Sequence, residues 1–512
     1  MQLKYRDIFK QLALGILGFI GASVILLLTS RHGAGLTPDS VAYISAARNL
    51  AEGHGFLTYN GLHLVVQPPL YPIMLAVIKK IIFIDPQISA GYVNAVLFGF
   101  IIYLSGLLLL RYLNSFALIF LGTVSVLISF ALVQASLMAL SEPLFIFLVL
   151  LFLYYFGRYQ SKRDFVSFFL FSVSAAMTCL TRYTGIIIIL TGIICIFLWG
   201  RSNIKEKFWH SLVFTLIAAL PIGIWVIRNY LISGTLVGQR AASSYTLLEN
   251  LIFFFNTVLP WYLPLNSIGI YFIFIFLIVT TWILFGLYPA KSSRREAIKL
   301  IGPNLIFVLF YSGVIVISST TTAYDQISDR LLSPIYIPVI FILFFISDKI
   351  LSWLLESLHL KLITMLFIIG IVLLISYPVK STIHIMKDFI ELSGWGYSCD
   401  SWRESETIEY VSRHKLLEKS YTLYSNEPEA VYILTNLKTK RSPAKTFYNS
   451  PQLLNINQIQ KDVWLSAENV CLIWFDKTNR SFLFTIDELQ KNINMTEVAH
   501  FKDGEIYTFS CK

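Results

Sequence analysis

Runs of largely apolar residues, each about as long as a membrane-spanning helix, recur along the first three quarters of this 512-residue chain. A helix needs about 20 such residues to cross the hydrocarbon core of a bilayer. Charged residues make up 14% of the chain, whereas a soluble domain carries about 25%. The runs predict a mainly α-helical, polytopic membrane bundle with eleven spans, at about residues 11–29, 88–110, 115–136, 141–157, 165–181, 185–200, 208–228, 267–287, 300–318, 332–347 and 359–378.

The positions of the basic residues explain the net charge of +10. They precede the first span or cluster in short links between later spans, at Lys4, Arg6 and Lys10, Arg158, Lys162 and Arg163, Arg201, Lys205 and Lys207, and Lys291, Arg294 and Arg295. Because cytoplasmic loops carry such an excess, the N-terminus is expected in the cytoplasm and the protein in the plasma (inner) membrane. This pattern argues against nucleic-acid binding. The first run lacks a small-residue cleavage site, so it is expected to be an anchor and not a removed signal peptide.

Two outer segments are too long to be simple turns, residues 30–87 and 229–266. In the first, Thr37-Pro38-Asp39-Ser40 predicts a helix start and Gly53 its end. A second short helix is expected at about Ile73–Phe83, after a proline-rich entry. We expect both helices to lie on the membrane surface.

The composition changes after about residue 379, where apolar runs shorten to strand length. With an odd number of spans, residues 380–512 lie outside the cytoplasm and form a small soluble α/β domain, separate from a transmembrane domain of residues 1–379. Strands are expected at Thr422–Tyr424, Asn469–Phe475 and Glu505–Phe509, and helices at Glu427–Leu437 and Ile486–Asn494. One disulfide among Cys399, Cys471 and Cys511 is left open.

Ionisable residues recur at the outer ends of the predicted spans, where each calls for a role. They are Asp39, Arg48, Glu52, His54, Glu142, Arg182, Arg228, Arg240, Asp325, Asp329 and Arg330. Arginine binds phosphate oxygens bidentately, and a carboxylate can accept a proton from an attacking hydroxyl. A cluster of this kind fits a lipid substrate that carries a phosphate. The simpler alternatives are that the acids favour helix N-termini and that the arginines reach lipid headgroups.

Several motifs, in their order along the chain, resemble the glycosyltransferase-C superfamily. They are most similar to the branch that contains protein O-mannosyltransferases and the bacterial aminoarabinose transferases of lipid A. The motifs are Pro38-Asp39-Ser40-Val41-Ala42-Tyr43, Asn49-Leu50-Ala51-Glu52-Gly53-His54-Gly55, Gln67-Pro68-Pro69-Leu70-Tyr71-Pro72, Ser141-Glu142-Pro143-Leu144-Phe145, Thr181-Arg182-Tyr183-Thr184-Gly185, Arg228-Asn229-Tyr230 with Gly234, and Asp329-Arg330-Leu331-Leu332-Ser333-Pro334. Each motif is weak alone, but together they cover most of residues 1–340.

This resemblance implies a sugar donor on a polyprenyl phosphate, attacked at its anomeric carbon by an acceptor hydroxyl with inversion. Asp39 matches the catalytic aspartate of the family, and Glu142, at the acidic start of the fourth span, is the second candidate catalytic residue. The candidates for binding the donor phosphate are Arg330, Arg228, Arg182 and Arg240. The acceptor, which is a lipid, a glycan or a protein, and the sugar are left open.

The chain departs from the family at the second position of its first motif. Many relatives have an Asp-Glu pair where this chain has Asp39-Ser40. Hard cations favour several oxygen ligands, so no cofactor is firmly implied, and a divalent metal is not supported by the motif. His54 and His63 lack metal-ligand spacing and are interpreted as loop residues.

Two other functions compete with an enzyme. One is a transporter or flippase of a polyprenyl-linked glycan, which should bury charges at mid-membrane in broken helices and often has two related halves. The other is an inactive scaffold for the C-terminal domain. The charges cluster at one face and the halves do not match, which favours the glycosyltransferase. Trp261 and Tyr262 are interpreted as interfacial aromatic residues, not as sugar-stacking platforms.

Overall fold

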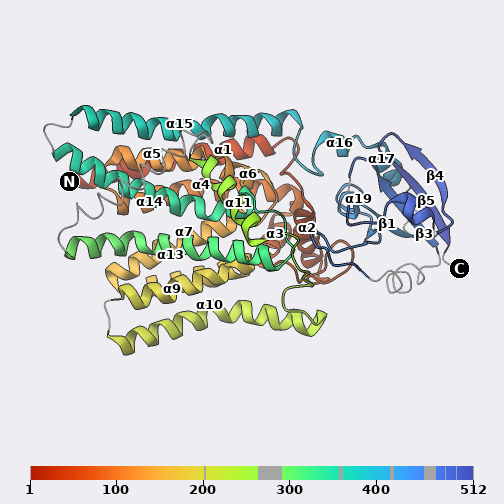
Figure 1. The fold of residues 1–512 in the computed structure, drawn as a ribbon, viewed down its shortest axis with the longest axis horizontal. Coiled ribbons are helices and arrows are strands. Elements are labelled where there is room, and N and C mark those ends of the chain that lie inside the picture. Colours follow the sequence, from red (N-terminus) through yellow and green to blue (C-terminus); the bar gives the residue numbers. More distant parts are fainter. Residues whose placement is uncertain are drawn as a thin grey trace.

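The computed structural model describes residues 2–200, 203–262, 291–356, 361–414, 420–454, 469–478, 480–491 and 493–510. A bundle of helices runs along the long axis of the molecule, and a small α/β domain is attached at one end (Figure 1). The N-terminal end of the chain lies at the far end of the bundle from this domain (Figure 1).

Seven described helices are long and apolar enough to cross a membrane. They are α1 (Gln2–Thr29), α4 (Pro86–Tyr112), α7 (Glu142–Lys162), α10 (Ile204–Ser233), α13 (Lys291–Thr321), α14 (Asp329–Glu356) and α15 (Lys361–Glu391). A pair bent by 43°, α5 (Phe116–Leu127) and α6 (Phe130–Leu137), would make an eighth span. The shorter apolar helices α8 (Phe165–Thr181) and α9 (Ile186–Trp199) fall on two further predicted spans. The predicted span at residues 267–287 lies outside the described residues.

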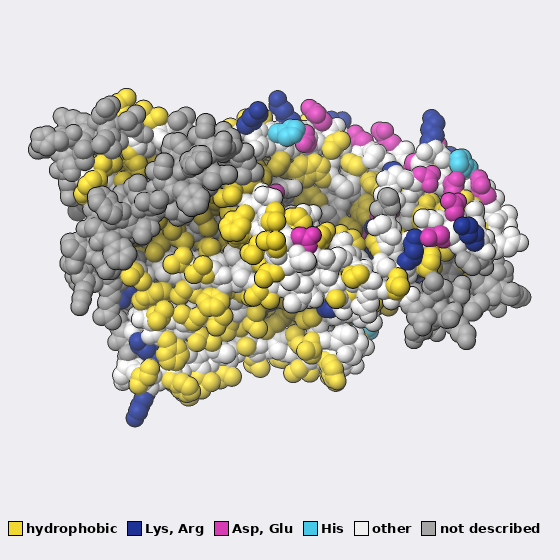
Figure 2. Space-filling model, viewed as in Figure 1, with side chains coloured by type: hydrophobic (Ala, Val, Ile, Leu, Met, Phe, Trp, Pro, Cys, Tyr) yellow, Lys and Arg dark blue, Asp and Glu magenta, His cyan; other side chains and the backbone are white. Residues whose placement is uncertain are grey.

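Hydrophobic side chains cover most of the described bundle on the face seen in Figure 2. Acidic side chains gather instead over the C-terminal domain and the neighbouring end of the bundle (Figure 2). An apolar belt around a helical bundle is what a lipid environment requires. The predicted fold class is confirmed, and the protein is an integral membrane protein.

Close packing of the first two long helices depends on glycine. A Cβ atom added at Gly18 of α1 would lie 2.7 Å from the carbonyl oxygen of Gly99 in α4, and one added at Gly99 would lie 2.8 Å from that of Gly18. Small residues let membrane helices approach closely where no hydrophobic effect drives them together.

Both helices that the sequence predicts between residues 30 and 87 are present. In α2 (Pro38–Ala51), Thr37 Oγ1 accepts a hydrogen bond from the Ser40 backbone N–H, and Ser40 Oγ accepts one from the Thr37 N–H. This capping box fixes the helix start. Helix α3 (Leu70–Ile82) begins earlier than expected, because Pro72 falls in its first turn, where a helix has no use for the missing N–H.

The C-terminal domain contains a five-stranded mixed sheet in the order β2-β1-β3-β5-β4. Strand β1 (Thr422–Ser425) is parallel to both β2 (Lys440–Arg441) and β3 (Asn469–Phe475), and β5 (Gly504–Ser510) is antiparallel to β3 and β4 (Thr496–Phe501). The sequence missed β2 and β4, and the helix predicted at Ile486–Asn494 is shorter, since α21 is Ile486–Gln490. Three more short helices complete the described part, α16 (Asp400–Arg403), α17 (Glu406–Arg413) and α19 (Pro428–Thr435).

The structure also bears on the expected end of the last span and on the disulfide that was left open. Helix α15 runs past the expected end of the last span and continues to Glu391, with Pro378 inside it. Cys399 and Cys471 are both free, and Cys471 is buried in the sheet. Cys511, the third candidate for a disulfide, lies outside the described residues.

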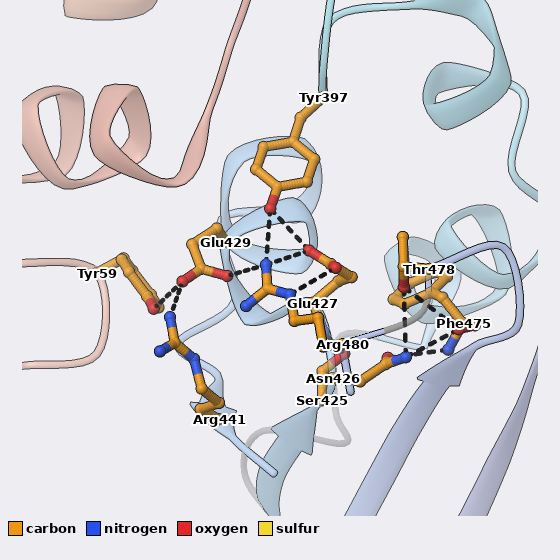
Figure 3. Close-up of polar contacts among 10 residues, drawn as sticks. All are labelled: Tyr59, Tyr397, Ser425, Asn426, Glu427, Glu429, Arg441, Phe475, Thr478 and Arg480. Carbon is orange, nitrogen blue, oxygen red and sulfur yellow. Dashed lines mark hydrogen bonds and ion pairs between the residues drawn. The ribbon is translucent and has the colours of Figure 1, made fainter. Parts of the chain in front are cut away.

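A buried charged network joins the C-terminal domain to the first outer segment (Figure 3). Tyr59 donates a hydrogen bond to Glu429 at 2.9 Å, and Arg441 pairs with the same carboxylate at 2.5 Å. Arg480 pairs with Glu429 at 3.2 Å and with Glu427 at 2.5 Å. Buried charges require such partners, so the network favours one fixed position of the domain on the bundle.

Candidate functional site

The segment just before α2 is clamped on both sides, and this positions Asp39. On one side, the Gly35 N–H donates to the carbonyl of Leu137 at the end of α6, at 2.8 Å. On the other side, the Leu36 N–H donates to Trp395 at 2.9 Å, and the Leu36 carbonyl accepts from Tyr397 at 3.0 Å.

Glycine is required at one point of this clamp. Gly396, between Trp395 and Tyr397, has a φ of +61°, and a Cβ atom there would lie 1.9 Å from the carbonyl oxygen of Leu36. Other residues adopt this backbone conformation at a cost, and here a side chain would also collide. The C-terminal domain therefore supports the helix start that carries Asp39.

Arg330 joins the two predicted catalytic carboxylates. Its Nε donates to Glu142 Oε1 at 2.8 Å, and its NH2 group donates to Asp39 Oδ2. A third carboxylate, Asp325, lies 3.6 Å from NH1. One guanidinium thus brings together residues from α2, α7 and α14, which are separated by 188 and 291 positions in the chain.

Glu142 is fully buried at the first position of α7. Its Oε1 lies 2.5 Å from NH1 of Arg182, in addition to the Arg330 contact. Its second oxygen, Oε2, is buried without a hydrogen-bond partner among the described residues. An unpaired buried acceptor is uncommon and costs free energy, so this oxygen is available to a donor group of a ligand.

Asp39 is the more exposed of the two carboxylates, with 36% of its side chain accessible. Its Oδ1 accepts a hydrogen bond from Gln67 Nε2 at 3.0 Å. Burial favours the neutral acid, but the charge and hydrogen bond of Arg330 outweigh it and hold the pKa of Asp39 below its usual value. Asp39 is therefore ionised at neutral pH and held by Arg330.

An open cavity of about 480 Å³ is lined by the chain neighbours of two cluster residues, Gln326 next to Asp325 and Asp329 next to Arg330, while Asp39, Glu142, Arg182 and Arg330 do not line it. Residues from α6, from the region of α11 (Leu247–Val258) and η2 (Leu259–Trp261), and from the loop before α14 line it, namely Phe130, Asn256, Thr257, Pro260, Gln326, Ile327, Ser328 and Asp329. Half of these side chains are polar and uncharged. The volume is within the range of about 300–1,000 Å³ typical of small-molecule sites.

Two predicted phosphate-binding arginines lie outside the cluster. Arg228 donates to the Leu64 carbonyl at 2.7 Å and lies over the Trp225 ring at 4.5 Å. Arg240 donates to the Val237 carbonyl at 2.9 Å and lies over the Tyr324 ring at 5.2 Å. Both arginines contact loop residues, Leu64 for Arg228 and Val237 and Tyr324 for Arg240. The structure thus brings Asp39, Glu142, Arg182 and Arg330 together and leaves Arg228 and Arg240 apart.

Several contacts of the site were not predicted. Gln67 belongs to the motif Gln67–Pro72, but nothing in the sequence indicates that its amide contacts Asp39. Asp325 was one of eleven candidate ionisable residues, and its contact with Arg330 was not predicted. Trp261, expected at the membrane interface, is instead fully buried, and its indole N–H donates to Asp329 at 2.6 Å. This bond fixes the turn that begins α14 and presents Arg330. In the described part of the chain, no three His, Cys, Asp or Glu side chains are grouped so that they could hold a metal ion.

Several solved membrane proteins have a fold similar to that of this chain. ArnT from Cupriavidus metallidurans in the apo state is 11% identical, with a TM-score of 0.59 over 100% of this chain and 99% of that chain. The same protein bound to undecaprenyl phosphate is 12% identical, with a TM-score of 0.58 over 99% and 98%. The archaeal oligosaccharyltransferase AglB from Archaeoglobus fulgidus, in complex with an inhibitory peptide and a dolichol-phosphate, is 11% identical, with a TM-score of 0.52 over 92% and 70%.

Sequence comparison adds less. No family model matches the chain. An uncharacterized protein of Aquifex aeolicus (strain VF5) is 23% identical over 284 residues, which are 53% of this chain. The chain spans about half the length of that curated relative, 54%. The fold expected from the motifs is confirmed by the structural neighbours.

Proposed function

We propose that this protein is a membrane glycosyltransferase that moves a sugar from a polyprenyl-phosphate donor to an acceptor hydroxyl, with inversion at the anomeric carbon. The observation that carries the proposal is Arg330, which joins Asp39 and Glu142 through one guanidinium. The shared fold supports it, because ArnT and AglB were solved with undecaprenyl phosphate and dolichol-phosphate, respectively.

The donor phosphate competes with Asp39 for Arg330. A guanidinium binds phosphate oxygens bidentately, so the donor takes the NH1 and NH2 groups while Nε stays on the buried Glu142. Arg182, on the other side of Glu142, adds a second positive charge. Losing Arg330 removes the main cause of the low pKa of Asp39. Donor binding therefore frees Asp39 and raises its basicity.

The transfer step then uses Asp39 as general base. Asp39 takes the proton of the acceptor hydroxyl while the acceptor oxygen forms a bond to the anomeric carbon. The bond between that carbon and the phosphate oxygen breaks, and the polyprenyl phosphate leaves. The negative charge that develops on the leaving phosphate is stabilised by Arg330 and Arg182. Stabilisation of a developing charge by fixed donors is a large term in catalysis. Glu142 keeps both guanidinium groups in place.

The proposed location is the plasma (inner) membrane, with a cytoplasmic N-terminus and the site on the outer face. Supporting it are the basic links between the spans and the opposite positions of the two chain ends (Figure 1). We divide the chain into a transmembrane glycosyltransferase domain, residues 1–379, and an extracytoplasmic domain, residues 380–512. No cofactor is part of the proposal.

The bent pair α5 and α6 is the feature of the described bundle that resembles the broken helices of a transporter, and it gives this alternative little support. At the break between α5 and α6, the carbonyl of Ile128 accepts a hydrogen bond from Thr382 Oγ1 at 2.6 Å. The freed backbone group is thus satisfied by protein, and the break carries no ionisable residue. A transported substrate would need such groups at mid-membrane.

A transfer assay tests the proposal. Membranes containing the protein are incubated with a panel of polyprenyl-phosphate sugars carrying a labelled sugar, together with envelope extract as the source of acceptor. We expect one label to move to a product that no longer extracts with the donor, and the Asp39→Asn variant not to make it. Movement of the intact lipid-linked label across the membrane, without cleavage, would favour the flippase.

A further inference from the structure

A second cavity lies in the C-terminal domain, at the end of its parallel strands. It has a volume of about 270 Å³ and is lined in part by Asn426, Lys445, Trp474, Thr478, Arg480 and Phe484. Asn426 directly follows β1, Trp474 lies at the end of β3, and Thr478 follows three residues after that end. In the sheet, β1 lies between the next two strands of the chain, with β2 on one side and β3 on the other. The carboxyl edge of parallel strands at such a switch point is where α/β sheets place ligands.

The charges at this cavity are already neutralised. Arg480 forms ion pairs with Glu427 and Glu429, so its charge is not available to pair with a ligand (Figure 3). Lys445 pairs with Glu488 at 2.7 Å. An anionic ligand would have to displace Glu427 and Glu429 from Arg480, and separating a pair whose carboxylates are buried is costly. The Lys445–Glu488 pair is partly exposed and already neutral. The cavity therefore fits an uncharged ligand.

The remaining lining fits a polyhydroxylated ring. Trp474 is half-buried and supplies an aromatic ring, whereas the ring of Phe484 has the Lys445 ammonium over it, 5.9 Å from the ring centroid. Within the described residues, the indole N–H of Trp474 and the hydroxyl of Ser481, which also lines the cavity, have no protein partner. Asn426 is engaged with the Phe475 backbone and shapes the wall (Figure 3). A volume just below the usual range for drug-sized ligands suits a single sugar ring.

One segment connects this cavity to the catalytic cluster. Lys445 lines the cavity, and four residues further along the chain, Asn449 donates to the Tyr324 carbonyl at 2.9 Å. The neighbour of Tyr324, Asp325, lies 3.6 Å from Arg330. Four residues span at most about 14 Å, so the cavity and the cluster belong to one outer region.

We propose that this cavity is a subsite for an uncharged sugar ring of the acceptor. This inference rests on the proposed function and narrows the acceptor to a carbohydrate with more than one sugar unit. One unit stacks on Trp474, and another presents its hydroxyl to Asp39. The C-terminal domain is then both a support for α2 and part of the substrate site.

Binding is tested directly, without donor. Saturation-transfer NMR is recorded on the detergent-purified full chain with the methyl glycosides of glucose, galactose and N-acetylglucosamine, and with methyl glucuronide as a charged comparison. We expect at least one neutral glycoside to bind, with little dependence on salt. Trp474→Ala should weaken it about tenfold, and Trp474→Phe much less, because a face remains. Trp209→Ala, at an exposed position of α10, is the matched control and should bind as the parent does.

The outcomes separate the two proposals. Failure of every neutral glycoside to bind, binding unaffected by Trp474→Ala, or binding of the glucuronide alone would each overturn the subsite. If Trp474-dependent binding is found but no labelled sugar is ever transferred from a donor, the proposed function fails and the sugar site stands. Melting curves of Trp474→Phe verify that the tested chain is folded.

Discussion

Replacing Arg330 with lysine is the most informative change to the charged cluster. Every nitrogen of this guanidinium faces a carboxylate, with Nε on Glu142 at 2.8 Å, NH2 on Asp39 and NH1 at 3.6 Å from Asp325. One ammonium cannot hold Glu142 and a donor phosphate in the same geometry. Arg330→Lys keeps the charge beside the buried Glu142, so the variant should fold, whereas Arg330→Ala would leave that carboxylate dependent on Arg182 alone and cost about 3–5 kcal/mol.

The expected loss in donor affinity follows from the bonds removed. A hydrogen bond to a charged group is worth about 1.5–3 kcal/mol, and Arg330→Lys removes one such bond to the phosphate. The Kd for a polyprenyl-phosphate sugar should therefore rise about 10- to 150-fold. Binding is measured on purified, monodisperse protein by scintillation proximity with a labelled donor.

Arg228→Lys is the matched control for this measurement. Arg228 also lies near the end of a long helix, but its partners are the Leu64 carbonyl and the Trp225 ring. Its substitution should change the donor Kd less than twofold. Equal effects of the two substitutions, or an unchanged Kd in Arg330→Lys, would refute the assignment of the phosphate to Arg330.

Further outcomes are expected away from this arginine. Gly396→Ala should lower the stability of the protein by about 1–3 kcal/mol, because the new Cβ atom meets the Leu36 carbonyl; an unchanged melting temperature would contradict the clamp. Burial opposes the charge on Glu429, but Arg441 and Arg480 hold its pKa below the usual value. The stabilisation from this low pKa is present above the unfolded value of about 4.3 and is lost as pH falls through the folded pKa. Glu429→Gln should therefore lower the melting temperature at pH 7 more than at pH 4, and an equal loss at both would count against the network. A periplasmic reporter fused after Lys512 should be active, and activity of a cytoplasmic reporter there would refute the proposed topology.

The sequence predicted the parts of this molecule that local rules determine. Apolar length predicted the long apolar helices of the described bundle. Thr37 with Ser40 predicted the start of α2, since a capping box is read from neighbouring residues. Strand β3 has a continuous apolar run, β1 has only the pair Leu423-Tyr424, and both were found. Strand β2 has two residues and β4 is mostly exposed, so neither carries a hydrophobic pattern that could distinguish it.

The candidate site was predicted in its members but not in its partners. Motif order identified Asp39, Glu142, Arg182 and Arg330, yet pattern alone ranked Arg228 beside them. Which arginine reaches a carboxylate depends on how α7, α8 and α14 pack, and no local signal encodes that. The same holds for Trp261. An aromatic residue near the end of a span suggested a place at the membrane interface, but the side chain is buried and its indole N–H donates to Asp329.

The role of Asp39 as general base is the central claim, and turnover of Asp39→Asn tests it most directly. Asparagine keeps the size of the side chain and can still accept from Gln67 but cannot take the proton of the acceptor. Transfer per purified, monodisperse molecule should fall by about 10²–10⁴-fold at saturating donor, with donor binding retained. If Asp39 only favours the start of α2, stability changes by less than about 1 kcal/mol and transfer per folded molecule stays near the parental value; that result would contradict the account.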